Sequence, residues 1–396
     1  MNASAWRVTL AAAALMALIT GGRSAFGLFV SPLNTASGLG LATLSFGLAL
    51  GQLAVGFTQP LVGALADRLG AARVIVVAAA LLALCTALPA WSPTPALLML
   101  SLVAGAVAGS AVGSNGLLIG EVNRAVPPER AGFAVGVVGA GASAGLLLLG
   151  PSTQWAIDAR GWAWALAATA VLGLVAWPLA LAMRRPAVAV AAPRASAPVA
   201  DVLREWRFWR VALSFGVCGF HIAFLAAHMP GVIERCGLPA SLAGTWIAVA
   251  GAANVAGSVA VGLAMRRGDA AALLACMYGV RALGVAALLA LPATPAVMLG
   301  FAAVMGASHM ATLPPTAQLV ARQHGVERLG TLFGVVMLVH QVGSFAGIWF
   351  GGWAAVATGS DDLLWAVDIA LALAAAALVL PTTARRRAAA LAARAA

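Results

Sequence analysis

The chain carries little charge: only 9% of its 396 residues are charged, against about a quarter in an ordinary soluble domain. Hydrophobic residues make up 62%, which excludes a soluble globular protein. Lysine is absent, so all 23 basic residues are arginine. The net charge of +11 is spread over the ends of apolar segments rather than gathered in one patch, so we expect no nucleic-acid partner.

Cysteine and the signatures of common enzymes are also scarce. Cys85, Cys218 and Cys276 fall in apolar segments and Cys236 stands alone, so neither a disulfide framework nor a metal site is expected. The chain has no H-E-x-x-H and no G-x-x-x-x-G-K-[ST] sequence. The hydrolase-like "GASAG" at 141–145 lies inside an apolar helical segment without a preceding strand. We therefore expect neither an enzyme nor an ATP-driven pump, and no cofactor.

Long apolar runs are what the chain has instead. A helix needs about 20 apolar residues to cross the hydrocarbon of a bilayer, and twelve such runs predict an all-α, multi-pass membrane protein. The predicted spans are 8–30, 42–66, 74–91, 96–120, 131–154, 162–183, 208–229, 242–265, 270–291, 295–319, 330–355 and 361–381.

The arginines predict how the chain is oriented in the membrane. If the N-terminus is cytoplasmic, 19 of the 23 lie on that side, namely Arg7, Arg68, Arg73, Arg124, Arg130, Arg184, Arg185, Arg194, Arg204, Arg207, Arg210, Arg266, Arg267, Arg322, Arg328, Arg385, Arg386, Arg387 and Arg394. Positive charge is retained on the inner side of membranes. We therefore expect both termini in the cytoplasm, in the plasma (inner) membrane of a bacterium.

The chain divides into two halves that repeat each other. A Pro-, Ala- and Arg-rich segment at 184–207 separates a six-span half at 1–183 from a second at 208–396. "ERAGFAVGVV" (129–138) matches "ERLGTLFGVV" (327–336), and "GALADR" (63–68) matches "GLAMRR" (262–267). Parallel repeats of this kind are typical of transporters that bind substrate in a central cavity between two bundles.

The loop segment "GALADRLGAAR" at 63–73 resembles the G-x-L-a-D-R-x-G-R-R/K signature of the major facilitator superfamily. Ala71 and Ala72 stand where that family usually has basic residues. The resemblance implies a secondary transporter that works by alternating access. It also implies that Asp67 closes an internal gate, with Arg68, Arg73, Glu129, Arg130, Glu327 and Arg328 in the same charge network.

Two further segments resemble bacterial relatives of the monocarboxylate and oxalate–formate carriers. These are "GGRSAFGLFVSPL" in the first span and "FGVCGFHIAFLAAHMP" in the seventh. That branch usually carries an arginine in helix 8 where this chain has Ser258. The resemblance implies a small organic anion, in particular a monocarboxylate, as the substrate of a symporter.

Arg23 in the first span is the leading candidate for binding that anion. A charged residue at the centre of a span costs about 2.5–3.5 kcal/mol on insertion scales and is functional by default. Its guanidinium is a planar fork suited to carboxylates. The alternative is that Arg23 bonds only to neighbouring helices.

The only acid deep in a span is Asp368, at the same predicted depth as Arg281 in the ninth span. We expect an intramembrane ion pair between them, since each lowers the other's burial cost. In the alternative, Arg281 turns towards the cavity and joins the substrate site.

Histidines and amides complete the candidate substrate site. Imidazole titrates near neutral pH, so one of His221, His309 and His340 is a candidate to carry a coupled proton. The amide side chains in spans are candidates for hydrogen bonds to substrate, although such groups more often bond across helices; they are Gln52, Asn115, Asn254 and Gln341.

The sequence thus favours a monomeric proton-coupled importer or exporter of a small anion in the lipid bilayer. A multidrug or metabolite efflux antiporter is the alternative, because the Gly-rich fifth span ends in Gly150-Pro151, which resembles an antiporter signature. A membrane sensor that transports nothing is the third possibility.

Overall fold

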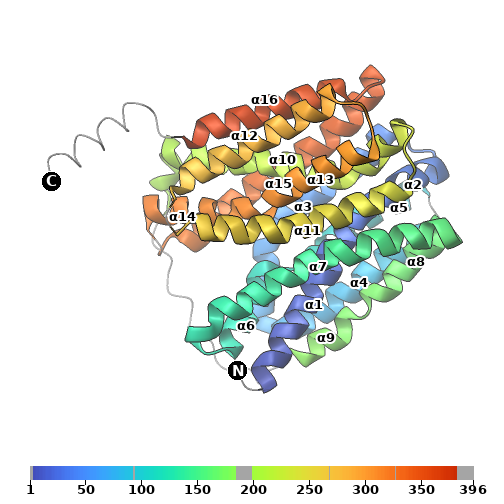
Figure 1. The fold of residues 1–396 in the computed structure, drawn as a ribbon. Helices are drawn as coiled ribbons and strands as arrows, with labels where there is room; N and C mark the ends of the chain where they lie inside the picture. Colours follow the sequence, from blue (N-terminus) through green and yellow to red (C-terminus); the bar gives the residue numbers. More distant parts are fainter. Residues whose placement is uncertain (1–2, 92–93, 184–198, 267, 326, 381–396) are drawn as a thin grey trace.

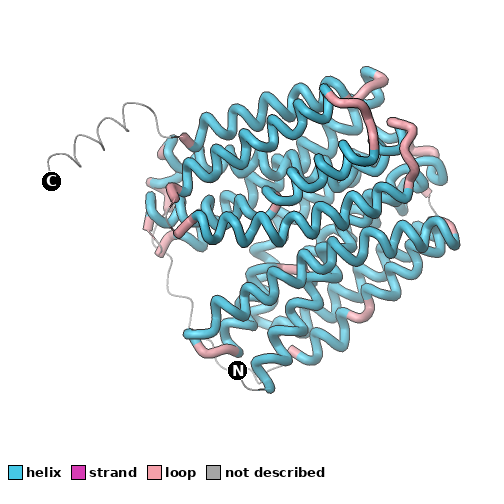
Figure 2. The backbone as a smooth tube through the Cα atoms, in the orientation of Figure 1, coloured by secondary structure: helices cyan, strands magenta, loops and turns pink. Residues whose placement is uncertain are grey.

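The structure, a computed structural model, describes residues 3–91, 94–183, 199–266, 268–325 and 327–380, without the side chains of Asp67 and Pro128. Within these ranges the chain is helical throughout apart from short connections (Figure 2). Twelve helical segments are long and apolar enough to cross a membrane. The predicted all-α membrane fold with twelve spans is therefore confirmed.

The first half contributes six spans, coloured blue to green in Figure 1. Its elements are α1 (Ala3–Ala25), η1 (Phe26–Phe29), α2 (Val30–Ser37), α3 (Leu41–Leu69), α4 (Ala71–Trp91), α5 (Pro95–Val112), α6 (Asn115–Ala125), α7 (Pro128–Arg160), α8 (Trp162–Gly173) and α9 (Ala176–Ala182). The first span joins α1, η1 and α2, the fourth joins α5 and α6, and the sixth joins α8 and α9.

The second half contributes the other six spans. Its elements are η2 (Val202–Arg204), α10 (Trp206–Arg235), α11 (Ser241–Ala264), α12 (Ala270–Ala290), α13 (Pro295–Ser308), η3 (Met310–Thr312), α14 (Leu313–His324), α15 (Leu329–Thr358) and α16 (Asp362–Val379). The tenth span joins α13, η3 and α14. Of the predicted linker, residues 184–198 lie outside the described residues.

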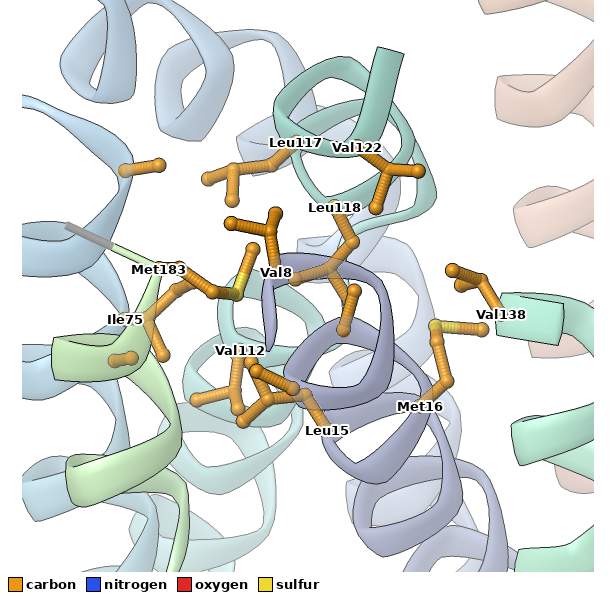
Figure 3. Packing of buried hydrophobic residues seen from close by; sticks show 14 of the residues in the cluster. Val8, Leu15, Met16, Ile75, Val112, Leu117, Leu118, Val122, Val138 and Met183 are labelled. Atoms are coloured by element: carbon orange, nitrogen blue, oxygen red, sulfur yellow. The ribbon is translucent and has the colours of Figure 1, made fainter. Parts of the chain in front are cut away.

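The core of the first half is built around α1. Val8, Leu15 and Met16 of α1 pack against apolar side chains of α4, α5, α6, α7 and α9, as Figure 3 shows. A helix satisfies its own backbone hydrogen bonds, which is what a chain in hydrocarbon requires. Apolar side chains of the surrounding helices can therefore pack on several sides of α1 at once.

Glycines let α7 approach α1 closely. A side chain at Gly141 or Gly145 would meet the backbone carbonyls of Ala13 and Ala17 of α1. Small residues at such contacts are typical of helix packing in membranes. Gly132 and Gly136 of the same helix, by contrast, have nothing within 4 Å of the place where a Cβ would project.

The two halves pack along two helix pairs. We call the face that carries the end of α9 and the start of α10 the linker side, and the opposite face the far side. Along α7 and α11, Gly150 lies against Gly244 and Ile247, and Leu146 lies against Gly251.

Along α3 and α15, Ser45 lies against Gly352, and the ring of Phe46 lies 6.2 Å from that of Trp349. All of these contacts fall between the middle of the spans and the far side. Towards the linker side α7 and α11 diverge (Figure 1). The described residues therefore form a structure closed between its halves on the far side.

Candidate functional site

Arg23 lies in α1 just before the helix tightens into η1. Its Nη2 donates a hydrogen bond to Oε1 of Gln52 in α3, at 2.9 Å. The side chain is exposed even though it lies within a predicted span. Four residues further on, a side chain at Gly27 would meet the carbonyl of Ala226 in α10 of the second half. Arg23 is therefore an accessible cation next to the interface of the two halves.

Arg23 and Gln52 line a cavity of about 180 Å³. Its walls come from α1, η1, α2, α3, α4, α5, α7, α8 and α9, all of the first half, and consist largely of leucine, alanine and glycine. The two-fold repeat predicts a central cavity shared by both halves. The cavity that Arg23 lines, which we call the Arg23 cavity, lies within the first half instead. Among the described residues that line it, Arg23 alone is charged.

Two hydroxyl groups on the cavity wall are already engaged in hydrogen bonds. Thr86 donates to the carbonyl of Leu82, and Thr169 to the carbonyl of Ala165, both at 2.8 Å. Only one hydrogen bond of Arg23 is formed among the described residues, although a guanidinium has five N–H donors. The cavity therefore offers strong donors at one place and an apolar surface elsewhere.

Two spans are interrupted at corresponding places in the two halves. The fourth breaks at Gly113 and Ser114, whose hydroxyl accepts from the amide of Leu117 at 3.4 Å. The tenth breaks at His309, where η3 joins α13 to α14. The sequence prediction treated both spans as continuous, although Gly113-Ser114 and Pro314-Pro315 were signals of a break. Interrupted helices in matching positions commonly mark the binding region of a transporter.

The predicted direct ion pair between Arg281 and Asp368 is wrong: no contact within ion-pair distance joins these two described side chains. His221 of α10 lies between them, with Nε2 3.0 Å from Asp368 Oδ1 and Nδ1 3.5 Å from Arg281 Nη1. The His221 side chain, which extends from α10, thus separates the two predicted partners although α12 and α16 pack against each other. We call Arg281, His221, Asp368 and Ser308 the buried polar cluster.

Arg281 is held mainly by the end of a helix. Its Nη2 donates to the carbonyl of Ser308 at 2.6 Å, and its Nε donates to the hydroxyl of the same residue at 2.9 Å. Ser308 is the last residue of α13, where carbonyl groups lack partners within the helix. Arg281 therefore stabilises the break in the tenth span, a role that nothing in the sequence indicated.

The three candidate histidines occupy different surroundings. The sequence suggested that His221 lies on the wall of the substrate cavity. The residue is fully buried instead. His309 and His340 are half-buried, and the ring of His340 lies 4.9 Å from that of Phe215. None of the three is among the described residues that line the Arg23 cavity.

Two candidate substrate-binding amides serve instead to join elements. Asn254 donates to the hydroxyl of Ser143 in α7 at 2.9 Å and accepts from the amide of Met310 at 3.0 Å. Gln341 of α15 is buried against Gly56 of α3. Both residues therefore act at the contact between the halves. This is the alternative stated above, that amide side chains in spans more often bond across helices than bind substrate.

Asn115 is exposed at the start of α6, directly after the break in the fourth span. It stays a candidate for contact with substrate, together with Arg23 and Gln52. These three are the predicted polar residues that the structure leaves accessible on the first half.

The predicted gate residues lie at the linker side. Arg68, Arg73, Glu129, Arg130 and Glu327 are exposed, and no ion pair joins them across the halves within the described part of the chain. The side chain of Asp67 lies outside it. Arg328 pairs with Asp201, with Nη1 3.1 Å from Oδ2. The sequence did not foresee that partner, which precedes η2.

Comparison with known proteins assigns the family. Residues 12–348 match the model of the Major Facilitator Superfamily, and the chain belongs to that family. It is 24% identical over 352 residues, 83% of each chain, to the uncharacterized MFS-type transporter YcxA of Bacillus subtilis (strain 168).

Solved structures with the same fold include a bacterial homologue of the human lysosomal transporter Spinster. Its inward-facing, unoccupied form has a TM-score of 0.69 and 16% identity, covering 96% of this chain and 95% of that one. Its inward-facing, occupied form gives the same score and identity over 96% and 94%. The chain is thus a multi-pass transporter of this superfamily.

Proposed function

We propose that this transporter moves a small organic anion, with a monocarboxylate the best match, and that protons drive it. The observation that carries this proposal is Arg23, a permanent cation within a span that is open to water and has one hydrogen bond, to Gln52. A guanidinium with free N–H donors in an otherwise apolar site binds carboxylates in bidentate fashion.

The Arg23 cavity favours an anion with an apolar body. A cavity of about 150 Å³ lined by apolar side chains is sufficient to bind benzene. The Arg23 cavity, at about 180 Å³, accommodates an aromatic ring or a short branched chain attached to the carboxylate. Arg23 alone is charged among its described lining residues, so a second carboxylate would be buried without a cation. This favours monoanions over dicarboxylates.

The distribution of arginine supports a cytoplasmic location for both termini. In that orientation the linker side is the inner side of a bacterial plasma membrane. The packing of the halves on the far side is then an inward-facing conformation, in keeping with transport by alternating access.

Ligand binding to purified protein tests the proposed substrate class. A ligand that binds the folded state raises the apparent thermal midpoint. Benzoate is expected to raise it in the wild type, whereas uncharged benzamide is expected to have little effect. Arg23→Gln is expected to abolish the benzoate effect, and Arg23→Lys to leave little of it, because an ammonium lacks the planar fork.

Arg7→Gln provides the matched control, since Arg7 is an exposed arginine of the same helix. It is expected to respond to benzoate as the wild type does. An unchanged benzoate effect in Arg23→Gln would contradict the anion site. Stabilisation by lipophilic cations without any effect of carboxylates would favour the efflux antiporter instead.

A further inference from the structure

The buried polar cluster is separate from the Arg23 cavity and contains three titratable groups. Arg281 and His221 are 0% exposed and Asp368 is 1% exposed. They come from α12, α10 and α16. Ionisable residues are costly within spans and are retained there mainly for function. Helix packing alone would be served better by apolar residues at these positions.

The contacts of His221 define its protonation state. An arginine side chain can only donate hydrogen bonds, so Nδ1 of His221, 3.5 Å from Arg281 Nη1, acts as an acceptor. The proton of the neutral ring is therefore on Nε2, which faces Asp368 Oδ1 at 3.0 Å. A second proton on Nδ1 would point at the guanidinium. An added proton is therefore expected to bind to Asp368 rather than to His221.

The carboxylate of Asp368 is poorly compensated when ionised. Although His221 Nε2 is near, Oδ1 accepts no well-aligned hydrogen bond within the described part of the chain. No ion-pair contact joins Arg281 to Asp368 among the described residues, because Ser308 holds the guanidinium. A buried carboxylate whose one nearby donor is poorly aligned is stabilised by taking up a proton.

We propose that Asp368 is the residue that binds the transported proton, and that His221 and Arg281 position it. The inference rests on the proposed proton coupling and names the site that performs it. One proton from water adds to the carboxylate as the transporter faces one side and leaves unchanged on the other. No other bond is made or broken.

Other titratable groups surround the cluster. From α10, Cys218 lies 3.3 Å from Thr312 Oγ1. From α12, Tyr278 donates to the carbonyl of Ser214 at 2.6 Å. His340 of α15, which lies against Gly219 of α10, and His309, which follows the last residue of α13, are further titratable residues near the cluster. Among these, Asp368 is the only carboxylate.

Contacts connect Asp368 to the interface of the halves. With Asp368 ionised, its charge balances that of Arg281; with Asp368 protonated, the Ser308 carbonyl is the main partner of Arg281. Ser308 precedes the break of the tenth span, whose Met310 amide is bonded to Asn254. Asn254 in turn bonds to Ser143 of the first half. Proton binding thus changes the forces on the segment that joins the cluster to the opposite bundle.

Proteoliposomes separate proton coupling from substrate binding. In Asp368→Asn the uncharged side chain resembles a carboxyl group that is always protonated. We expect it to exchange labelled benzoate for internal benzoate at close to the wild-type rate, and to lose at least about tenfold of the accumulation driven by an inward proton gradient. His228→Gln is the matched control, because His228 is a buried histidine of the same helix that bonds only to the Ile348 carbonyl; it should accumulate normally.

His221→Gln extends the test to a variant that keeps the carboxyl group. It is expected to shift the pH at which accumulation is half-maximal, and it replaces Asp368→Asn if that variant does not fold. Normal accumulation by Asp368→Asn, or an unshifted pH profile in His221→Gln, would overturn the proposal. Failure of the wild type to exchange or accumulate any carboxylate would instead contradict the proposed function.

Discussion

Two arginines, Arg23 and Arg281, lie deep within the spans, and their surroundings differ. Arg23 is accessible and has one hydrogen bond, to Gln52. Arg281 is fully buried and is bonded to both the carbonyl and the hydroxyl of Ser308. The sequence identified both as unusual because a charge in a span is costly. It could not distinguish them, because the difference lies in which neighbouring helix offers an acceptor.

Replacement of Arg281 tests its role at the end of α13. Arg281→Met leaves the buried Ser308 carbonyl without a donor, which costs about 1–3 kcal/mol. Arg281→Lys keeps the charge but cannot make both bonds to Ser308, so we expect a stability between those of Arg281→Met and the wild type. Thermal and denaturant unfolding in detergent measure this order. A stability of Arg281→Lys equal to that of the wild type would show that charge alone matters.

The sequence does not reveal which helices are neighbours, and this explains why the predicted pair between Arg281 and Asp368 is wrong. The count of residues from each end of the spans placed both at the same depth. It did not reveal that His221 lies between them, because the lateral order of α10, α12 and α16 is a property of the packed bundle.

At the scale of elements, apolar length and composition predicted the twelve spans, since each span must satisfy its own backbone. The interruptions at Ser114 and His309 were missed. Hydropathy is continuous across both interruptions. Only Gly113 and Pro314-Pro315, treated as helix-breaking residues, indicate them in the sequence. Directly after the first of these interruptions, Asn115 is exposed.

The contact of α1 with α7 provides a matched pair of glycine variants. Gly145→Val would place its side chain against the carbonyl of Ala17, whereas Gly139→Val would enter open space. Overpacking costs about 1–3 kcal/mol. We expect Gly145→Val to lower the thermal midpoint clearly and Gly139→Val to leave it nearly unchanged. Equal effects of the two variants would show that helix propensity, rather than close approach, determines the result.

At the scale of the whole molecule, the halves pack on the far side through α3 with α15 and α7 with α11. The Arg23 cavity lies in the first half and the buried polar cluster in the second. The repeat of "ERAGFAVGVV" and "ERLGTLFGVV" predicted two related bundles, but the two bundles carry different polar residues. Sequence symmetry therefore indicated the fold, whereas the placement of the Arg23 cavity and the buried polar cluster in different halves required the structure.

Uptake by proteoliposomes tests the central claim, that Arg23 binds the anion that this transporter carries. Under an inward proton gradient, wild-type protein is expected to accumulate labelled benzoate, and Arg7→Gln to match it. Arg23→Gln is expected to reduce uptake to the level of liposomes without protein. Accumulation by Arg23→Gln at the wild-type rate, or the absence of carboxylate uptake by the wild type, would contradict the account.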